Sequence, residues 1–276
     1  MGESKNNPFL WLSLGAAAVL SGAALAVPAA AEDRAFCANR PGLGTPACTV
    51  APGQVMVETG VADWSREGDA EARADTLVLG DTLVRVGVAQ VAEVQLGWTP
   101  FAHLHRRIRG SGAVEAADRA GDALVGFKLN VAHPGGEGFS AAVQSELSLP
   151  VGRAPIGAGD WGINTVVPLS WELPGGIGLA AAPEVDAAVN GDGHGRHLAW
   201  GGTVGVDVAV GSQVSASAEL QALRDDDPAG HATHCYAGVA LAWQAGRNWQ
   251  LDTGLDAGLN RASEDVALHL GFARRF

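Results

Sequence analysis

The sequence predicts an all-β protein, a transmembrane antiparallel up-and-down β-barrel of about twelve strands. Three observations carry this prediction. Apolar and polar residues alternate along many segments of about ten residues, the length of a tilted strand that crosses a bilayer. The connections between these segments are alternately short and long, and the chain ends on an aromatic residue, Phe276.

Residues 1–31 have the composition of a secretion signal. Lys5 lies in a short polar start, and an apolar run follows over 9–27. Such segments are removed after export, and we expect cleavage after Ala31. A membrane anchor helix is the alternative, but Pro28 and the small residues near the cleavage site favour removal.

Residues 32–53 are rich in Pro and Gly and are predicted to form a periplasmic segment ahead of the barrel, which covers 54–276. Export places Cys37 and Cys48 in an oxidising compartment, so we expect them to form a disulfide; a reduced pair is the alternative. We hypothesise that this rigid segment is a short plug of the lumen or a clasp at its rim.

The barrel strands are read from alternation with a period of two residues. In the first strand the apolar face begins at Val55, and the opposite face carries Glu58. The predicted segments cover 54–64, 75–89, 92–99, 122–131, 141–149, 163–172, 179–189, 200–208, 214–220, 239–243, 251–255 and 266–272. A soluble sandwich alternates in the same way, so alternation alone leaves open whether the apolar face meets lipid or a packed core.

The lengths of the connections favour the barrel. Long connections are expected at 66–74, 100–120, 150–161, 190–196 and 224–233, and short ones at 90–91, 134–138, 174–176, 211–212 and 245–247. Only the final connection, near 260–264, is expected to be short where the alternation would place a long one. Bacterial outer-membrane barrels have short periplasmic turns and long external loops, with aromatic girdles at both membrane interfaces. We therefore expect the bacterial outer membrane as the location, its lipids and lipopolysaccharide as partners, and Phe276 as the signal for the barrel-assembly machinery.

The strand face opposite the apolar one is predicted to line the lumen, and it is rich in carboxylates. Its candidate residues are Glu58, Asp81, Arg85, Glu93, Lys128, Glu146, Glu172, Glu184, Asp186, Asp207, Glu219, Asp252 and Asp256. In an open pore such a wall would favour cations. In a plugged interior, Arg85 and Lys128 would instead tie several carboxylates together. The sequence leaves both possibilities open.

The charge composition and two local clusters of side chains bear on whether the protein binds nucleic acid, lipopolysaccharide or a metal. The excess of 30 acidic over 18 basic residues argues against binding to a nucleic-acid backbone. One basic cluster in the expected loop 100–120 is either a solvated loop or a contact for lipopolysaccharide phosphates; it consists of His103, His105, Arg106, Arg107 and Arg109. No second ligand pair accompanies His231, His234 and Cys235, so neither a metal nor a cofactor is predicted.

Several segments are similar to those of a known family. They are NRPGLGTPACTV at 39–50, EVQLGWTP at 93–100, SLPVGRAPIGAGDWG at 148–162, PEVDAAV at 183–189, RDDDPAGH at 224–231 and the ending NRASEDVALHLGFARRF. Over the expected mature chain the sequence resembles the outer-membrane transporter family named for the meta-pathway of phenol degradation. Relatives more often have Asp where this chain has Asn39. The resemblance implies passage of small solutes, including aromatic compounds, and carries over no site residue.

The leading functional interpretation is a passive channel or transporter whose lumen selects small solutes by size and charge. An outer-membrane hydrolase or acyltransferase would need Ser or Asp gathered with His at one rim, and no nucleophile signature accompanies the loop histidines, so no enzyme is predicted. A third interpretation is a structural or adhesive barrel with a filled interior. The solute and the direction of transport stay open.

Overall fold

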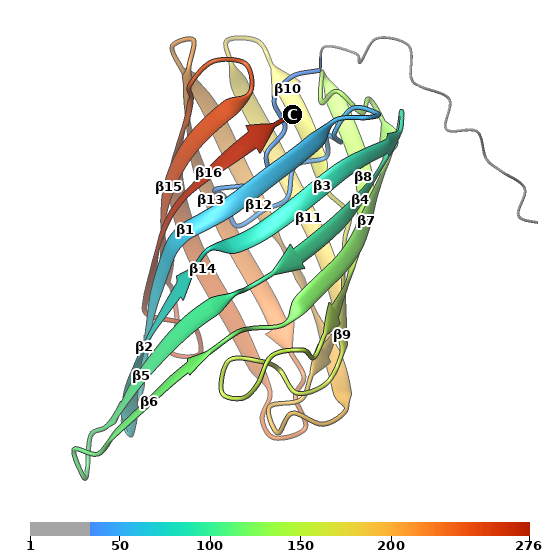
Figure 1. Ribbon diagram of the computed structural model, residues 1–276. Coiled ribbons are helices and arrows are strands. Elements are labelled where there is room, and N and C mark those ends of the chain that lie inside the picture. The colour runs from blue at the N-terminus through green and yellow to red at the C-terminus, as the bar shows by residue number, and fades with distance from the viewer. Residues whose placement is uncertain (1–33) are drawn as a thin grey trace, which may run out of the picture.

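The structure, a computed structural model, describes residues 34–276, and the predicted signal peptide at 1–31 lies outside the described residues. One antiparallel sheet contains all the strands, and β16 pairs back onto β1, which closes it into a barrel (Figure 1). The strands are β1 (Val55–Gly68), β2 (Ala72–Leu79), β3 (Asp81–Ala89), β4 (Ala92–Trp98), β5 (Phe101–Ile108), β6 (Val114–Arg119), β7 (Ala123–Ala132), β8 (Phe139–Leu149), β9 (Gly162–Val166), β10 (Leu169–Leu173), β11 (Ile177–Val189), β12 (Arg196–Val210), β13 (Val214–Asp225), β14 (Ala232–Gln244), β15 (Trp249–Gly258) and β16 (Val266–Arg275).

Four of the wall crossings are interrupted, so the 16 strands form a barrel of 12 crossings. Gly80, with a φ of 74°, separates β2 from β3. Pro100 and Pro168, which lack a backbone donor, lie in the breaks between β4 and β5 and between β9 and β10. Residues 120–122 separate β6 from β7. The predicted number of about twelve strands is confirmed.

The two faces of the wall differ as the alternation predicts. The outer face exposes large apolar side chains, for example Leu270 and Trp200, which are each 52% exposed. The inner face contains fully buried charged side chains, including Arg85 and Lys128. An apolar outside around a polar interior is the pattern of a transmembrane barrel. Among residues 34–276, no helix is long and apolar enough to cross a membrane.

The two ends of the barrel differ in their connections. Short turns, such as 174–176 and 211–213, lie at the end where β1 begins and β16 finishes. Four longer loops, 150–161, 190–195, 226–231 and 259–265, lie at the other end. The first three lie close to the expected positions, and the fourth is longer than the short final connection expected near 260–264. We call these two ends the turn end and the loop end.

Two expected long loops are wrong. Strands β1 and β2 extend over most of 66–74 and leave only 69–71 as a turn, and β5 and β6 form a hairpin over most of 100–120 (Figure 1). These extensions project beyond the loop end, where both faces carry polar residues, so alternation does not mark them in the sequence. Cross-strand pairs accompany them instead, such as Arg66 Nε and Asp75 Oδ1 at 2.7 Å.

Candidate functional site

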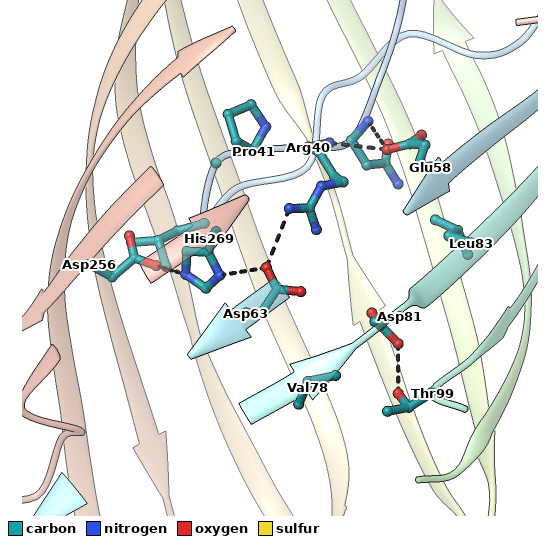
Figure 2. Close-up of a pocket in the computed structure, with 13 residues that line it drawn as sticks. Arg40, Pro41, Glu58, Asp63, Val78, Asp81, Leu83, Thr99, Asp256 and His269 are labelled. Carbon is teal, nitrogen blue, oxygen red and sulfur yellow. Dashed lines mark hydrogen bonds and ion pairs between the residues drawn. The ribbon is translucent and has the colours of Figure 1, made fainter. Parts of the chain in front are cut away.

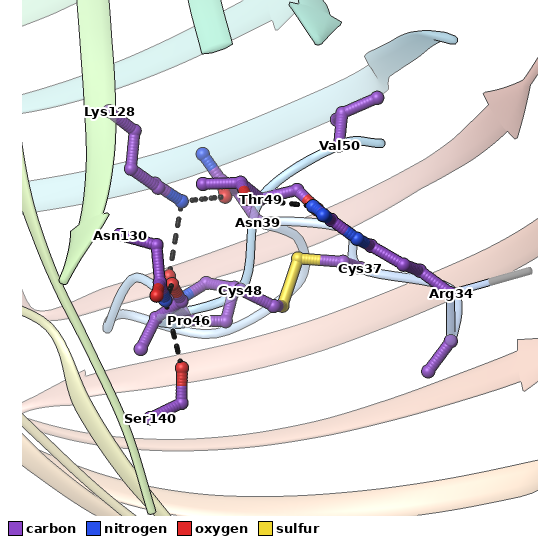
Figure 3. The surroundings of a disulfide bond; sticks show 12 residues. Arg34, Cys37, Asn39, Pro46, Cys48, Thr49, Val50, Lys128, Asn130 and Ser140 are labelled. Carbon is purple, nitrogen blue, oxygen red and sulfur yellow. Dashed lines mark hydrogen bonds between the residues drawn. A yellow bond between two sulfur atoms is a disulfide. The ribbon is translucent and has the colours of Figure 1, made fainter. Parts of the chain in front are cut away.

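Residues 34–53, which we call the lumen segment, fold into the barrel at the turn end (Figure 1). The sequence predicts a periplasmic segment here, with a plug or rim clasp as the hypothesis. In the structure its backbone and side chains bond to inward-facing residues on opposite walls, so it crosses the lumen. The predicted disulfide between Cys37 and Cys48 is confirmed and holds two parts of the segment together (Figure 3).

A buried charge cluster attaches the lumen segment to one side of the wall. Arg85 lies between two carboxylates, with its Nε 2.7 Å from Glu93 Oε1 and its Nη1 2.8 Å from Glu58 Oε1. The same Nη1 donates to the carbonyl of Cys37 at 2.6 Å. All three charged side chains are at most 1% exposed. Burial is tolerated because each charge is both paired and hydrogen-bonded.

The two carboxylates of this cluster also accept hydrogen bonds from the backbone of the lumen segment. Glu58 Oε2 accepts from the amides of Asn39 and Arg40, at 2.8 and 3.1 Å. Glu93 Oε2 accepts from the amide of Val50 at 2.7 Å. Each carboxylate therefore joins the guanidinium group on β3 to the segment in the lumen.

Strand β7 adds a second attachment (Figure 3). Lys128 Nζ donates to Asn39 Oδ1 and to the carbonyl of Pro46, both at 3.1 Å. Asn130 Nδ2 donates to the carbonyl of Ala47 at 2.8 Å. Lys128 is fully buried, so its ammonium group depends on these acceptors and on the neighbouring carboxylates.

The opposite wall holds the far side of the lumen segment. Glu219 on β13 accepts from the amides of Leu43 and Gly44, at 2.5 and 3.2 Å. Arg40 Nε lies 3.2 Å from Asp252 Oδ1 on β15. The segment is thus bonded to strands on both sides of the barrel, which makes it an obstacle across the lumen.

A cavity of about 550 Å³ lies beside residues 39–43 of the lumen segment, and we call it the central cavity (Figure 2). Its charged lining residues are Arg40, Glu58, Asp63, Asp81, Asp256 and His269, and its apolar ones are Pro41, Leu43, Val78 and Leu83. A neighbouring cavity of about 330 Å³ shares Leu43, Asp256 and His269 with it. Volumes of this order hold small organic molecules.

Two further cavities lie elsewhere in the barrel. One of about 440 Å³ is lined by Glu172, Asp207 and Glu219 together with the lumen segment. Another of about 390 Å³ is lined by Glu146 and Asp186 near the loop end. Polar spaces therefore exist on more than one side of the lumen segment.

The structure distributes the predicted lumen-lining residues over several separate groups. Glu58, Arg85, Glu93 and Lys128 form the buried cluster, and Asp252 pairs with Arg40. Asp81 and Asp256 line the central cavity. Glu172, Asp207 and Glu219 lie together, and Glu146, Glu184 and Asp186 lie toward the loop end. They do not form a single ring of charge.

Three of the ionisable residues that line the central cavity are absent from the candidates predicted from sequence: Arg40, Asp63 and His269. A β-bulge between Gly60 and Ala62 shifts the register of β1 against β16. Beyond the bulge, Asp63 pairs with His269 and faces the lumen, whereas strict alternation from Val55 would turn it outward. The pattern of the sequence gives no sign of this extra residue.

Two aspartates organise the long loops. Asp160 accepts from the amides of Trp161 and Gly195, at 2.8 and 3.0 Å, and these bonds hold its pKa below the ordinary value of 3.8. Asp227 joins loops 190–195 and 226–231 by accepting from the amides of Ala229 and Gly191, which likewise lowers its pKa. The loops are therefore connected to one another and not independent.

No group of three potential metal-ligating side chains gathers anywhere in residues 34–276, the cluster around His231 and Cys235 included. The basic residues expected in a loop lie instead mainly on β5, where His103 Nδ1 is 2.7 Å from Asp118 Oδ1 and Arg106 Nη1 is 3.4 Å from Glu115 Oε2. The cluster is therefore an ordered strand with acidic neighbours.

A closed antiparallel barrel with an apolar outer face and a charged interior defines a transmembrane β-barrel. Residues 38–276 match the family described as "Putative MetA-pathway of phenol degradation", and the chain belongs to this family. The resemblance inferred from sequence is thereby confirmed. No curated protein sequence matches the chain.

Several solved structures align with the chain at low sequence identity. The translocator domain of the autotransporter NalP from Neisseria meningitidis aligns with a TM-score of 0.51 and 11% identity, covering 81% of this chain and 88% of that one. A KdgM porin aligns with a TM-score of 0.47 and 11% sequence identity, covering 78% of this chain and 98% of that one. The CymD monoaromatic hydrocarbon channel aligns with a TM-score of 0.45 and 9% sequence identity, covering 82% of this chain and 89% of that one.

Proposed function

We propose that this protein is an outer-membrane channel that passes small solutes, aromatic compounds among them, through an acidic lumen. The observation that carries the proposal is a polar inner face enclosing cavities beside the lumen segment, within a wall whose outer face is apolar. Passage through such a lumen needs no covalent chemistry, because size and charge alone select the solute.

Aromatic solutes are included for two reasons. The family to which the chain belongs is described by phenol degradation. The central cavity also offers apolar contacts from Leu43, Val78 and Leu83, and the neighbouring cavity adds Tyr236. An aromatic ring gains free energy from such contacts, while polar groups around them fix its orientation.

We further propose that the lumen segment restricts passage. It is bonded to both sides of the wall through Glu58, Lys128 and Glu219. A solute that crosses the barrel must pass between this segment and the wall, or the segment must detach.

Single-channel conductance in a planar bilayer tests the proposal. The refolded protein should give discrete steps, and a variant that lacks residues 34–53 should give larger ones. Under a salt gradient the reversal potential should indicate cation preference, reduced when Glu184 and Asp186 are changed to Gln and Asn. A correctly folded deletion variant that stays silent would reject the channel. Unchanged step size after deletion would reject restriction by the segment.

The proposal also includes the location of the protein in the outer membrane and its contacts with the assembly machinery and with lipopolysaccharide. Phe276 bonds through its amide to the carbonyl of Val55 at 2.8 Å and is 60% exposed, so an assembly factor could reach its ring. We propose that the barrel-assembly machinery recognises it during insertion into the bacterial outer membrane. Lipopolysaccharide phosphates would meet His103, His105 and Arg107 on the β5 extension.

A further inference from the structure

We propose that the central cavity binds organic cations, meaning small solutes with an ammonium-type head and an apolar body. The inference deepens the proposed function and rests on it, since it names the class of solute that the lumen selects. It is carried by three inward carboxylates, Asp63, Asp81 and Asp256, beside the apolar side chains of the same cavity (Figure 2).

Each of these carboxylates keeps one oxygen without a protein donor. Asp81 Oδ1 accepts from Thr99 Oγ1 at 2.6 Å, and Asp256 Oδ2 lies 2.7 Å from His269 Nε2. Asp63 Oδ1 meets Arg40 Nη2 at 3.4 Å and His269 Nδ1 at 3.3 Å. Within residues 34–276, the second oxygen of each group has no hydrogen-bond donor, so all three can accept one from a ligand.

The two basic side chains that line the cavity, Arg40 and His269, already contact carboxylates. Arg40 is shared between Asp63 and Asp252. His269 lies between Asp63 and Asp256 and contacts both. The fourth carboxylate, Glu58, is saturated by backbone amides and by a guanidinium group on β3. Among the described residues that line the cavity, carboxylates therefore outnumber basic side chains, and neither basic side chain is free to pair with an anionic solute.

The carboxylate oxygens without a protein donor determine which polar head group a solute must have. Carboxylate oxygens only accept hydrogen bonds, so a solute must bring donors. An ammonium group has three donors and a positive charge, whereas a hydroxyl group has one donor and no charge. A hydrogen bond to a carboxylate is charge-assisted for either head, but only the ammonium group adds Coulombic attraction to the carboxylates. A cationic head is thus favoured over a hydroxyl, and a carboxylate head is repelled.

The apolar side chains that line the two cavities favour a solute with an apolar body. Leu43, Val78 and Leu83 line the central cavity, and Leu43 continues into the neighbouring cavity beside Leu223 and Tyr236. A solute with its head near Asp256 can place a ring against these side chains. The face of Tyr236 also attracts a cation that passes over it.

Isothermal titration calorimetry of the refolded barrel, lumen segment included, tests the inference with three probes of similar shape. These are benzylammonium, benzyl alcohol and benzoate. We expect benzylammonium to bind, benzyl alcohol to bind more weakly, and benzoate not to bind. Equal binding of benzyl alcohol, or any binding of benzoate at the level of benzylammonium, would overturn the proposal.

A double variant locates the site. Asp81→Asn with Asp256→Asn keeps the shape of both side chains, and the new amide oxygen can still accept from Thr99 and His269. We expect benzylammonium to bind about 10- to 100-fold more weakly, the usual value of a charged hydrogen bond. The matched control is Asp118→Asn on β6, an exposed residue outside the lumen, which should leave binding unchanged. Unchanged binding in the double variant, or an equal loss in the control, would contradict the proposal.

Calorimetry detects binding without requiring passage. If benzylammonium binds as expected but the barrel shows no conductance, the proposed channel function is rejected and the cation site in the central cavity is supported. Conductance without benzylammonium binding would support the channel and reject the site.

Discussion

Replacement of Arg85 by Met tests how the lumen segment is held. Met has a similar length but no charge, so the variant leaves Glu58 and Glu93 buried without their common counter-ion. Both carboxylates are at most 1% exposed in the intact cluster. Removing one partner of a buried ion pair costs about 3–5 kcal/mol, because the remaining charge has lost its compensation.

Release of the lumen segment would relieve this cost. Water could then reach Glu58 and Glu93, and the barrel wall would stay closed through its backbone hydrogen bonds. A cost of about 3–5 kcal/mol corresponds to a shift of roughly two to four orders of magnitude in the ratio of bound to released segment. We therefore expect Arg85→Met to make residues 34–53 sensitive to protease and to increase single-channel conductance.

Arg66→Met is the matched control. Arg66 also pairs with a carboxylate at 2.7 Å, that of Asp75, but its side chain is 36% exposed and lies outside the lumen. Exposed pairs contribute about 1 kcal/mol or less, so this variant should keep a protected segment and the original conductance. A folded Arg85→Met barrel with an equally protected segment and unchanged conductance would refute the reasoning.

Three further predictions concern other parts of the molecule. Gly87→Ala should loosen the lumen segment, because an added Cβ would collide with the carbonyl of Ala51; faster hydrogen exchange at residues 49–53 would demonstrate it, and unchanged exchange would count against the close approach. Acid should release the long loops: the pKa values of Asp160 and Asp227 are lowered by backbone amides, so their stabilisation is present above pH 3.8 and is lost as the pH falls below it. Protection of loops 190–195 and 226–231 from hydrogen exchange should therefore be high at pH 6 and should decrease progressively as the pH is lowered from 3.8 through the lowered pKa values, and constant protection over this titration would contradict the prediction. Removal of Phe276 should reduce the amount of folded barrel in the membrane of cells, measured by heat-dependent gel migration, whereas normal insertion would exclude its role as an assembly signal.

The sequence alone determined the class of the protein and much of its wall. Side chains of a strand point alternately to the two faces, so a period of two residues is a local property that needs no knowledge of the neighbours. It correctly predicted a barrel of about twelve strands. The disulfide followed from composition and export, because two cysteines in a segment without a core have few other roles.

Only the tertiary structure decided what fills the lumen. The contacts of Glu58, Lys128 and Glu219 join residues that are distant in the chain, and no local pattern specifies which acceptor a buried cation will meet. The bulge at Gly60 turned Asp63 inward and created its pair with His269, because one extra residue reverses the face of everything beyond it. The extensions over 66–74 and 100–120 were missed since both of their faces are polar. The alternation of apolar and polar residues determines which face of the wall a side chain lies on. Its contacts depend on strand pairing and register, which are determined only when the wall closes.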